Sequence, residues 1–339
     1  MKLQYMAKLL KGGSQFKTIS NIVNRVHARS GKNKAAIFLD MLHCAAKYGA
    51  GYHDYLIFGW ETIPEAKRDT YLTRVRNKKL IEMVNDPSLY PTYDQKSLFD
   101  QRFSAYLKRD FRLVEGLTEE SLKSFVAGKE FIFAKPDEGE SGKGIERIRV
   151  AEHPDAAELL RYLTDPAKHF GVIEEELRQH EDLIRLYPHS INSMRINTLI
   201  DDNGEAQCLY ITCKMGNKGK FVDNMENDGL ACPVDPETGK ICGVAHTSPL
   251  INYDRHPYTG VELVGYQLPF IPEAIEFVKK AAMEEPRMRY VGWDVAITPE
   301  GPAIIEGNNY PGYDFSQLPE HTPDRIGTLA EVRKYVKGI

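Results

Sequence analysis

Val291-Gly-Trp-Asp-Val-Ala-Ile-Thr298 alternates apolar and polar residues, and Pro302-Ala-Ile-Ile-Glu-Gly-Asn-Asn309 repeats the pattern shortly afterwards. Alternation with period two is typical of a strand with one buried face, and Pro299-Glu-Gly301 between the two stretches indicates a turn. The sequence therefore predicts a β-hairpin. If the turn is centred on Glu300, Asp294 and Glu306 lie directly opposite each other.

The predicted hairpin carries three oxygen donors on one face. Asn308 shares the face of Glu306, because side chains two positions apart in a strand point the same way. Like charges directly opposite each other destabilise a sheet, so we expect a positive group between Asp294 and Glu306. Carboxylate and amide oxygens suit Mg2+, with room left for water and phosphate. A simply solvated polar face is the alternative that the hairpin alone leaves open.

The composition is that of a globular protein, and the length is enough for two or three lobes. The 339 residues are 42% hydrophobic and 27% charged, and the net charge of -4 gives no general affinity for nucleic acid or an anionic membrane. No secretory signal is visible, and no apolar stretch approaches the roughly 20 residues of a membrane span. The five cysteines include no CxxC motif. We therefore expect a reduced, cytoplasmic protein. The ten histidines show no ligand spacing such as HExxH, so no zinc site is expected.

The chain divides into a helical front and a mixed remainder. Residues 1 to about 90 are predicted to be largely helical, and short strands with intervening helices follow from about 130 onward. This order predicts an α+β fold rich in antiparallel strands. Strands are expected at 131–135, 145–150, 170–176, 195–200 and 206–214, and helices at 96–107, 154–163 and 272–284.

A glycine-rich segment joins the first two of these strands. Its glycines allow backbone conformations in which N–H groups converge on an anion, and a hydroxyl and an ammonium group accompany them. These residues are Gly139, Ser141, Gly142, Lys143 and Gly144. The spacing matches neither the P-loop nor the dinucleotide motif, both of which begin a helix. We interpret the segment as a hairpin lid over a nucleotide.

Lys135 precedes the lid inside an apolar strand, where an inward-pointing lysine needs an anionic partner. The order of a helix-opening lysine, a strand lysine, a glycine hairpin, an acidic strand, an arginine strand and Asp…Glu-x-Asn resembles the ATP-grasp superfamily. Among its members, the sugar-transfer-associated ATP-grasp family is the most similar. The resemblance extends from about Lys79 to Gln317. It implies two α+β subdomains that grip MgATP, over 91–175 and 176–339, after a helical section over 1–90.

The resemblance also implies how the nucleotide is held. Two lysines and the lid are implied to contact the phosphates of ATP. The hinge Val172–Leu177 is implied to contact the adenine, and a histidine is implied to contact the ribose. The residues at these positions are Lys96, Lys135, Gly139, Ser141, Gly142, Lys143, Gly144, Glu174, Glu175, Glu176, Leu177 and His180. Which of the three hinge glutamates faces the nucleotide stays open, although alternation places Glu174 and Glu176 on one face.

The metal ligands implied by the resemblance are Asp294, Glu306 and Asn308. Asn192-Ser-Met-Arg195 resembles the Asn-Thr-x-Arg of the family, so Arg195 is implied to stabilise charge on the γ-phosphate or a substrate carboxylate. A structural ion pair is the alternative for Arg195. Lys214 is expected to add a second positive charge at the same face.

The acceptor site is implied to lie near a loop that departs from the family pattern. Val222–Gly229 has one glycine where the family has two, which puts its contribution in doubt. The expected acceptor contacts are Asp223, Asn224, Tyr310, Tyr313 and Asp314.

The activity implied by the resemblance is that of an ATP-dependent ligase using Mg2+, with Mn2+ as an alternative metal. It would join a carboxylate to an amine, or less often a thiol, through an acyl phosphate. Sugars, amino acids and cell-surface polysaccharide precursors are the expected substrates. The alternatives are a kinase that phosphorylates a hydroxyl, with Asp223 or Asp314 as general base, and a nucleotide-binding module without catalysis. No nucleic-acid partner is expected, and the oligomeric state stays open.

Overall fold

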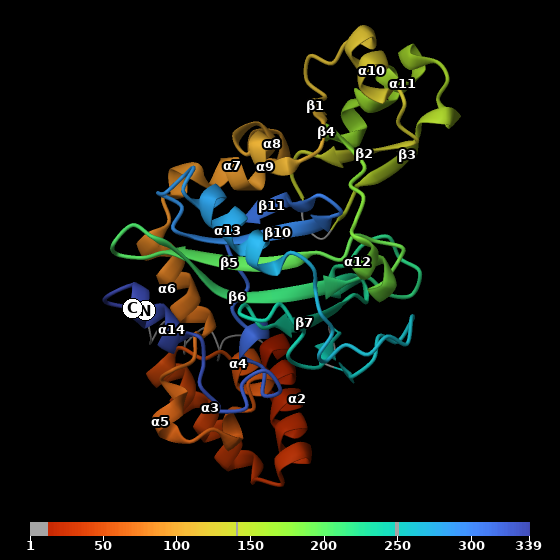
Figure 1. Ribbon diagram of the computed structural model, residues 1–339. Helices are drawn as coiled ribbons and strands as arrows, with labels where there is room; N and C mark the ends of the chain where they lie inside the picture. The colour runs from red at the N-terminus through yellow and green to blue at the C-terminus, as the bar shows by residue number, and fades with distance from the viewer. Residues whose placement is uncertain (1–12, 140–141, 248–250) are drawn as a thin grey trace. The chain divides into compact units, whose positions relative to one another are not determined.

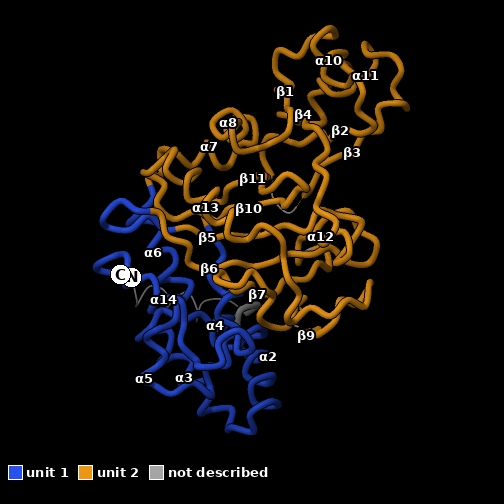
Figure 2. The backbone as a smooth tube through the Cα atoms, viewed as in Figure 1, with its two compact units in different colours: residues 1–85, 199–205, 311–339 blue, residues 86–198, 206–310 orange. Residues whose placement is uncertain are grey.

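The structure is a computed structural model that describes residues 13–139, 142–247 and 251–339. The chain forms two compact units (Figure 2). The helical unit comprises Met1–Asn85, Leu199–Glu205 and Pro311–Ile339, and the sheet unit comprises Asp86–Thr198 and Ala206–Tyr310. The boundary predicted near residue 175 between two ATP-grasp subdomains stays a prediction.

The helical front section is confirmed over its described residues. The helices of this unit are α2 (Gly13–Ser30), α3 (Lys34–Tyr48), α4 (Tyr52–Ile57), α5 (Glu65–Arg68), α6 (Arg74–Val84) and α14 (Leu329–Tyr335) (Figure 1). Among the helices in the described part of the whole chain, none is long and apolar enough to cross a membrane.

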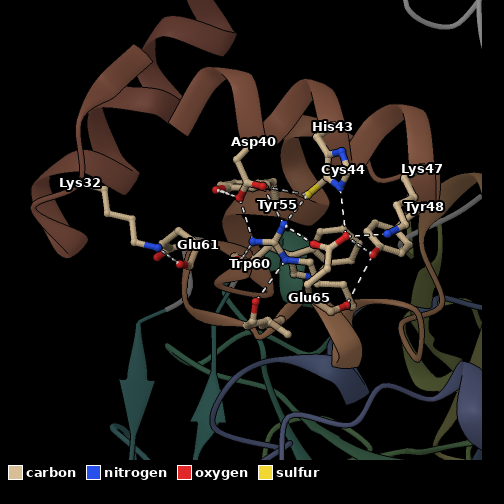
Figure 3. Close-up of polar contacts among 12 residues, drawn as sticks. Lys32, Asp40, His43, Cys44, Lys47, Tyr48, Tyr55, Trp60, Glu61 and Glu65 are labelled. Atoms are coloured by element: carbon tan, nitrogen blue, oxygen red, sulfur yellow. Dashed lines mark hydrogen bonds and ion pairs between the residues drawn. The ribbon is translucent and has the colours of Figure 1, made fainter. Parts of the chain in front are cut away.

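An ion-pair cluster joins α3 to α5 in the helical unit (Figure 3). Both Nη groups of Arg68 donate to the carboxylate of Asp40, at 2.7 and 2.8 Å. The carboxylate of Glu65 accepts hydrogen bonds from Lys47 and Tyr48, each at 2.7 Å. Arg68 is buried, and these contacts offset the cost of removing its charge from water.

The C-terminal segment belongs to the helical unit, although it follows the sheet unit in sequence. The amide of Gln317 donates to the Leu72 carbonyl at 2.8 Å and accepts from the Leu72 N–H at the same distance. The Tyr313 hydroxyl donates to Asp54 at 2.6 Å. These partners lie 245 and 259 positions apart, so no local sequence pattern predicts their association.

The sheet unit contains a four-stranded and a seven-stranded sheet. The smaller sheet has the order β1-β4-β2-β3, and each of these pairs is antiparallel. Its strands are β1 (Phe111–Leu113), β2 (Phe131–Pro136), β3 (Glu146–Arg149) and β4 (Phe170–Glu175), and it packs on α10 (Glu119–Val126) and α11 (Ala156–Leu163). The shared core includes Leu122, Phe125, Ile132 and Leu159.

The larger sheet has the order β11-β10-β5-β6-β7-β8-β9. Its strands are β5 (Met194–Ile200), β6 (Ala206–Met215), β7 (Leu230–Val234), β8 (Ala245–His246), β9 (Asn252–Tyr253), β10 (Tyr290–Thr298) and β11 (Gly301–Asn308). The remaining helices are α7 (Tyr90–Asp94), α8 (Lys96–Arg102), α9 (Ser104–Leu107), α12 (Glu181–Leu186) and α13 (Ile271–Ala282), of which α13 contacts β6, β10 and β11. The predicted α+β fold is therefore confirmed.

The predicted helix over 96–107 is two helices, α8 and α9, which are interrupted at Phe103. Phe103 packs edge-on against Trp293 of β10, with ring centroids 5.3 Å apart. Phe99 packs on both rings, and a Cβ at Gly307 of β11 would come within 2.8 Å of it. The aromatic cluster and this glycine hold α8 closely against the β10–β11 hairpin.

Candidate active site

The β10–β11 hairpin positions the predicted carboxylate pair. The turn is centred half a residue earlier than predicted, because Thr298 pairs with Gly301. A regular ladder from that turn would place Ile305 opposite Asp294. The register instead shifts at this point, and the resulting β-bulge makes Glu306 the partner of Asp294. The predicted pair is thus confirmed, although it depends on a bulge that the sequence pattern did not predict.

The bulge also changes which side chains face the same way. Consecutive residues of a regular strand point to opposite faces, yet Ile305 and Glu306 both line one pocket of the sheet unit. This pocket has a volume of about 590 Å3, and Asp294 lines it as well. An apolar side chain and a carboxylate are therefore presented side by side to the same space.

Two cations from neighbouring strands compensate Asp294. Arg195 in β5 donates through Nε and Nη2 to the two carboxylate oxygens, at 2.5 and 2.8 Å, and Lys214 in β6 donates to Oδ2 at 2.9 Å. Burial raises the pKa of Asp294, but the charges of Arg195 and Lys214 outweigh it and hold the pKa well below its usual range. The expected positive group is confirmed. It consists of the residues predicted to act on the γ-phosphate or a substrate carboxylate.

Glu306 is compensated only in part, because the charges of Lys214 and Arg195 act on it without outweighing its burial and the Asp294 charge. Among the ion pairs of the described residues, none involves its side chain, and burial together with the Asp294 charge raises its pKa. A bound cation would favour the deprotonated form. Asn308, the third predicted ligand, pairs with Gly292 across the hairpin, and its amide donates to the Gly292 carbonyl at 3.2 Å. Within the described residues no group of three His, Cys, Asp or Glu forms a metal cluster.

The other wall of the pocket contains the predicted strand lysine. Lys135 of β2 contacts Glu174 of β4 at 2.6 Å, and Arg109 donates to the same oxygen of Glu174 at 2.7 Å. Burial raises the pKa of Glu174, but the two cations outweigh it and hold the pKa well below its usual range. Lys135 therefore has the anionic partner that its position requires, and that partner is a protein carboxylate.

Lys96 begins α8, as predicted, and contacts the lid. Its Nζ donates to the Gly139 carbonyl at 3.1 Å. The three lid glycines have positive φ, and a Cβ at Gly142 would lie 3.2 Å from Val222. The lid joins β2 to β3, so the predicted hairpin is confirmed. Ser141 lies outside the described residues.

The three hinge glutamates have different partners. Glu174 binds Lys135 and Arg109, Glu175 lies 3.9 Å from Lys129, and Glu176 accepts from Arg147 at 2.7 Å. All three line the pocket, as does Leu177. His180, predicted at the ribose, is not among the lining residues; it caps α12, and its Nδ1 accepts from the Asp182 N–H at 3.2 Å.

The Val222–Gly229 loop contributes two of the predicted acceptor residues to the pocket, Asp223 and Asn224. The Asp223 carboxylate accepts from the N–H and the hydroxyl of Ser193, at 3.1 and 2.5 Å. Asp228 precedes Gly229 and has a φ of 67°, a conformation that aspartate tolerates better than most residues. The loop therefore keeps a left-handed residue despite the missing glycine.

The other predicted acceptor residues lie elsewhere. Tyr310 is exposed and does not line the pocket. Tyr313 and Asp314 belong to the helical unit, where Tyr313 contacts Asp54 and Asp314 caps a short 3-10 helix at Phe315. The acceptor role of these three residues therefore stays a prediction.

Sequence reasoning missed several charged residues of the pocket. Arg109, Arg147 and Arg178 all line it. Asp100 of α8 is buried next to them, and burial and then the Glu174 charge raise its pKa to about 8. Each is a single charged residue outside a recognisable motif, and the carboxylate partners of Arg109 and Arg147 lie 65 and 29 positions away in sequence. No pattern in the chain distinguishes them from surface charges.

The two sheets, the glycine hairpin between β2 and β3, and the carboxylate pair of β10 and β11 define a protein of the ATP-grasp class. The profile of the sugar-transfer associated ATP-grasp family matches residues 75–323, and the chain belongs to this family. Among curated protein sequences, none matches the chain.

Solved structures resemble the chain distantly. The ATP-grasp ligase PsnB, in complex with its minimal precursor, Mg and ADP, is 13% identical over 79% of this chain and 69% of its own, with a TM-score of 0.42. The D-cycloserine synthetase DcsG is 12% identical over 76% and 77%, with a TM-score of 0.43. D-alanyl-alanine synthetase A from Vibrio cholerae is 11% identical over 71% and 64%, also with a TM-score of 0.43.

Proposed function

We propose that the protein is an MgATP-dependent ligase that activates a carboxylate as an acyl phosphate and transfers the acyl group to an amine or a thiol. Membership of the ATP-grasp family supports ATP as the nucleotide. The observation that carries the proposal is the facing pair of Asp294 and Glu306, of which only Asp294 forms ion pairs with cations of the described residues. A sugar, amino acid or polysaccharide precursor is the proposed substrate.

In this reaction the residues of the chain position groups and neutralise charge. Lys96, Lys135 and the lid are proposed to hold the phosphates of ATP. A carboxylate oxygen of the substrate attacks the γ-phosphorus, the bond to the ADP oxygen breaks, and the amine later displaces phosphate. Fixed cations that already point at the site stabilise the charge of the transition state without reorganisation.

Mg2+ is proposed to bind at Asp294, Glu306 and Asn308, and Mn2+ is the alternative. The donor set fits a hard cation, because it consists of oxygens and includes a carboxylate whose pKa is raised by its surroundings. When bound, the ion neutralises phosphate charge. Asp294 would then share its oxygens with Arg195 and Lys214.

The substrate carboxylate needs a cation that is not already engaged. Arg195 and Lys214 both bind Asp294, so the role predicted for them is better assigned to supporting the metal pair. Lys143 and Arg178 line the same pocket, and neither has an ion pair with a described residue. We propose that these two cations contact the substrate carboxylate.

A kinase on the same fold is the second candidate, and one observation favours it. Asp223 lines the pocket and is held by two donors of Ser193, which is how a general base is oriented toward an acceptor hydroxyl. Under the ligase proposal, Asp223 orients the incoming amine.

The experiment is an assay of ADP and phosphate release with MgATP and pools of carboxylic acids, amino acids and sugars, with and without hydroxylamine. Hydroxylamine converts an acyl phosphate into a hydroxamate, which mass spectrometry identifies. Under the ligase proposal a hydroxamate forms and disappears in Asp294→Asn and Glu306→Gln. Glu276→Gln, an exposed carboxylate of α13, is the matched control and keeps the activity. ADP release with a phosphorylated acceptor and no hydroxamate would assign the kinase instead.

A further inference from the structure

Arg109 lies where α9 ends and the chain turns into β1. Lys108 adopts a φ of 53° and ends α9, and the next residue turns inward. The Arg109 side chain is only 2% exposed. A guanidinium buried to this extent requires partners for its charge and for its five N–H groups.

One side of the guanidinium binds the β-bulge of β11. Nη1 donates to the Ile304 carbonyl at 2.7 Å, and Nη2 reaches the Ile305 carbonyl at 3.4 Å. A bulge leaves its extra residue without a ladder partner, and Ile305 is that residue. Arg109 therefore donates to the unpaired residue of the bulge and to Ile304, the paired residue before it, next to Glu306.

The other side of the guanidinium binds the counter-ion of the strand lysine. Nε donates to Oε2 of Glu174, the oxygen that Lys135 also contacts. One planar group thus joins the hinge strand β4 to the strand of the metal carboxylate. A lysine could satisfy only one of these two directions, because its charge is a single point.

We propose that Arg109 is a positioning residue that sets the bulge of β11, and through it the orientation of Glu306 toward Asp294. It also fixes Glu174 and thereby Lys135. The inference rests on the proposed function, since it concerns how the carboxylate pair is presented to a divalent cation. It assigns no contact with the reacting atoms to Arg109.

The test compares Arg109→Lys with the wild-type full chain in titrations with ATP, without Mg2+ and at increasing Mg2+. Binding is followed by calorimetry. Arg109→Lys keeps the positive charge beside Glu174 but loses the second direction of donation. We expect metal-free ATP affinity to change less than 2-fold and the half-saturating Mg2+ concentration to rise about 10-fold. Arg287→Lys, on the surface of the same unit, is the control and leaves both values unchanged.

A double variant separates positioning from simple structural support. Arg109→Gln leaves Glu174 buried with Lys135 as its only cation, whereas Arg109→Gln with Glu174→Gln removes both charges. We expect the double variant to be less stable than Arg109→Gln, because the buried Lys135 then lacks its anionic partner. We expect both variants to share the raised Mg2+ requirement, because the bulge carbonyls still lack their donor. In the assay of the proposed reaction, we expect both variants to lower kcat by a larger factor than the factor by which they raise KM for ATP.

The outcomes distinguish this inference from the proposed function. Wild-type protein that binds ATP without any effect of Mg2+ would overturn the proposed metal site, and this inference with it. A normal Mg2+ response in the wild type together with an unchanged response in Arg109→Lys, or recovery of the response in the double variant, would overturn the positioning role alone.

Discussion

Asp294 and Glu306 face each other across one hairpin, yet their surroundings act on them in opposite directions. The pKa of Asp294 lies below its value in the unfolded chain, so its contribution to stability is complete above about pH 4 and is lost as the pH falls further. The pKa of Glu306 is raised by burial and by Asp294. The charge of Glu306 therefore opposes folding once the pH rises above the pKa that this group has in the unfolded chain. A divalent cation would remove that opposition.

The first prediction compares the amide variants of this pair in urea denaturation with EDTA at pH 7. Asp294→Asn leaves Arg195 and Lys214 without their counter-ion and is expected to lower the free energy of unfolding by about 3–5 kcal/mol. Glu306→Gln removes the unfavourable charge and is expected to raise it by up to about 1 kcal/mol. Both variants lose the stabilisation by Mg2+ that the wild type is expected to show. A Glu306→Gln variant less stable than the wild type in EDTA would contradict this.

A second prediction concerns Asp100, the buried carboxyl group beside Glu174. The unfolded chain releases its proton near pH 4 and the folded chain near pH 8, so stability falls as the pH rises through this window. Asp100→Asn removes the dependence. The free energy of unfolding of Asp100→Asn relative to the wild type should grow from no difference near pH 4 to an advantage on the order of 5 kcal/mol above pH 8. Denaturation at a series of pH values measures it, with the exposed Asp254→Asn as control; a constant difference would refute it.

Among individual residues, the sequence predicts those site residues that belong to a local pattern. Period-two alternation and a turn predict the hairpin that carries Asp294 and Glu306, whereas their direct pairing also depends on the bulge at Ile305. The roles of Asp100 and Arg109 were missed, because the partners of Arg109 lie 65 and 195 positions away and the charges of both are recognisable only once the sheets are packed.

Among the elements, the lid depends on glycine in two distinct ways. Gly142 has a φ of 72°, and a Cβ there would also press against Val222 at 3.2 Å. Gly128, between α10 and β2, has a φ of 75° with open space around it. A side chain at Gly128 would therefore meet only the requirement for a positive φ, whereas a side chain at Gly142 would also meet the neighbouring Val222–Gly229 loop.

The third prediction uses this matched pair. Gly128→Ala and Gly142→Ala should each cost about 1 kcal/mol of conformational energy. Only Gly142→Ala should lower ATP affinity, by about 10-fold, because its methyl group displaces the lid from the neighbouring loop. Calorimetric titration of both variants with MgATP checks this. Equal affinities for the two variants would show that the lid does not need the close approach.

Most elements were predictable because their signals are local. The five predicted strands begin and end within one residue of the observed ones, from β2 to β6. The helix over 96–107 was predicted as one element because its apolar spacing continues across Phe103. The break there arises from packing against Trp293, which belongs to a strand nearly 200 residues later. The bulge at Ile305 depends in the same way on a distant residue, Arg109.

At the scale of the whole molecule, each unit contains one of the two tryptophans of the chain. Trp60 is buried among Tyr48, Phe58 and Tyr71 of the helical unit. Trp293 is next to Asp294 in the sheet unit, and its indole N–H donates to Thr198 at 2.9 Å. In a Trp60→Phe background, tryptophan fluorescence therefore reports the unfolding of the sheet unit alone. In a Trp293→Phe background, it reports the unfolding of the helical unit alone.

The fourth prediction is that the two units respond separately to a change in one of them. Gln317→Leu in the Trp293→Phe background leaves the N–H and carbonyl of Leu72 buried without their partner. It should lower the stability of the helical unit, reported by Trp60, by about 2–4 kcal/mol. In the Trp60→Phe background, the same change should leave the Trp293 transition in place, and MgATP at 100 times its dissociation constant should raise it by about 2.7 kcal/mol. If Gln317→Leu shifts both transitions equally, the chain unfolds as one cooperative body, and the stabilisation by MgATP must then appear at Trp60 as well.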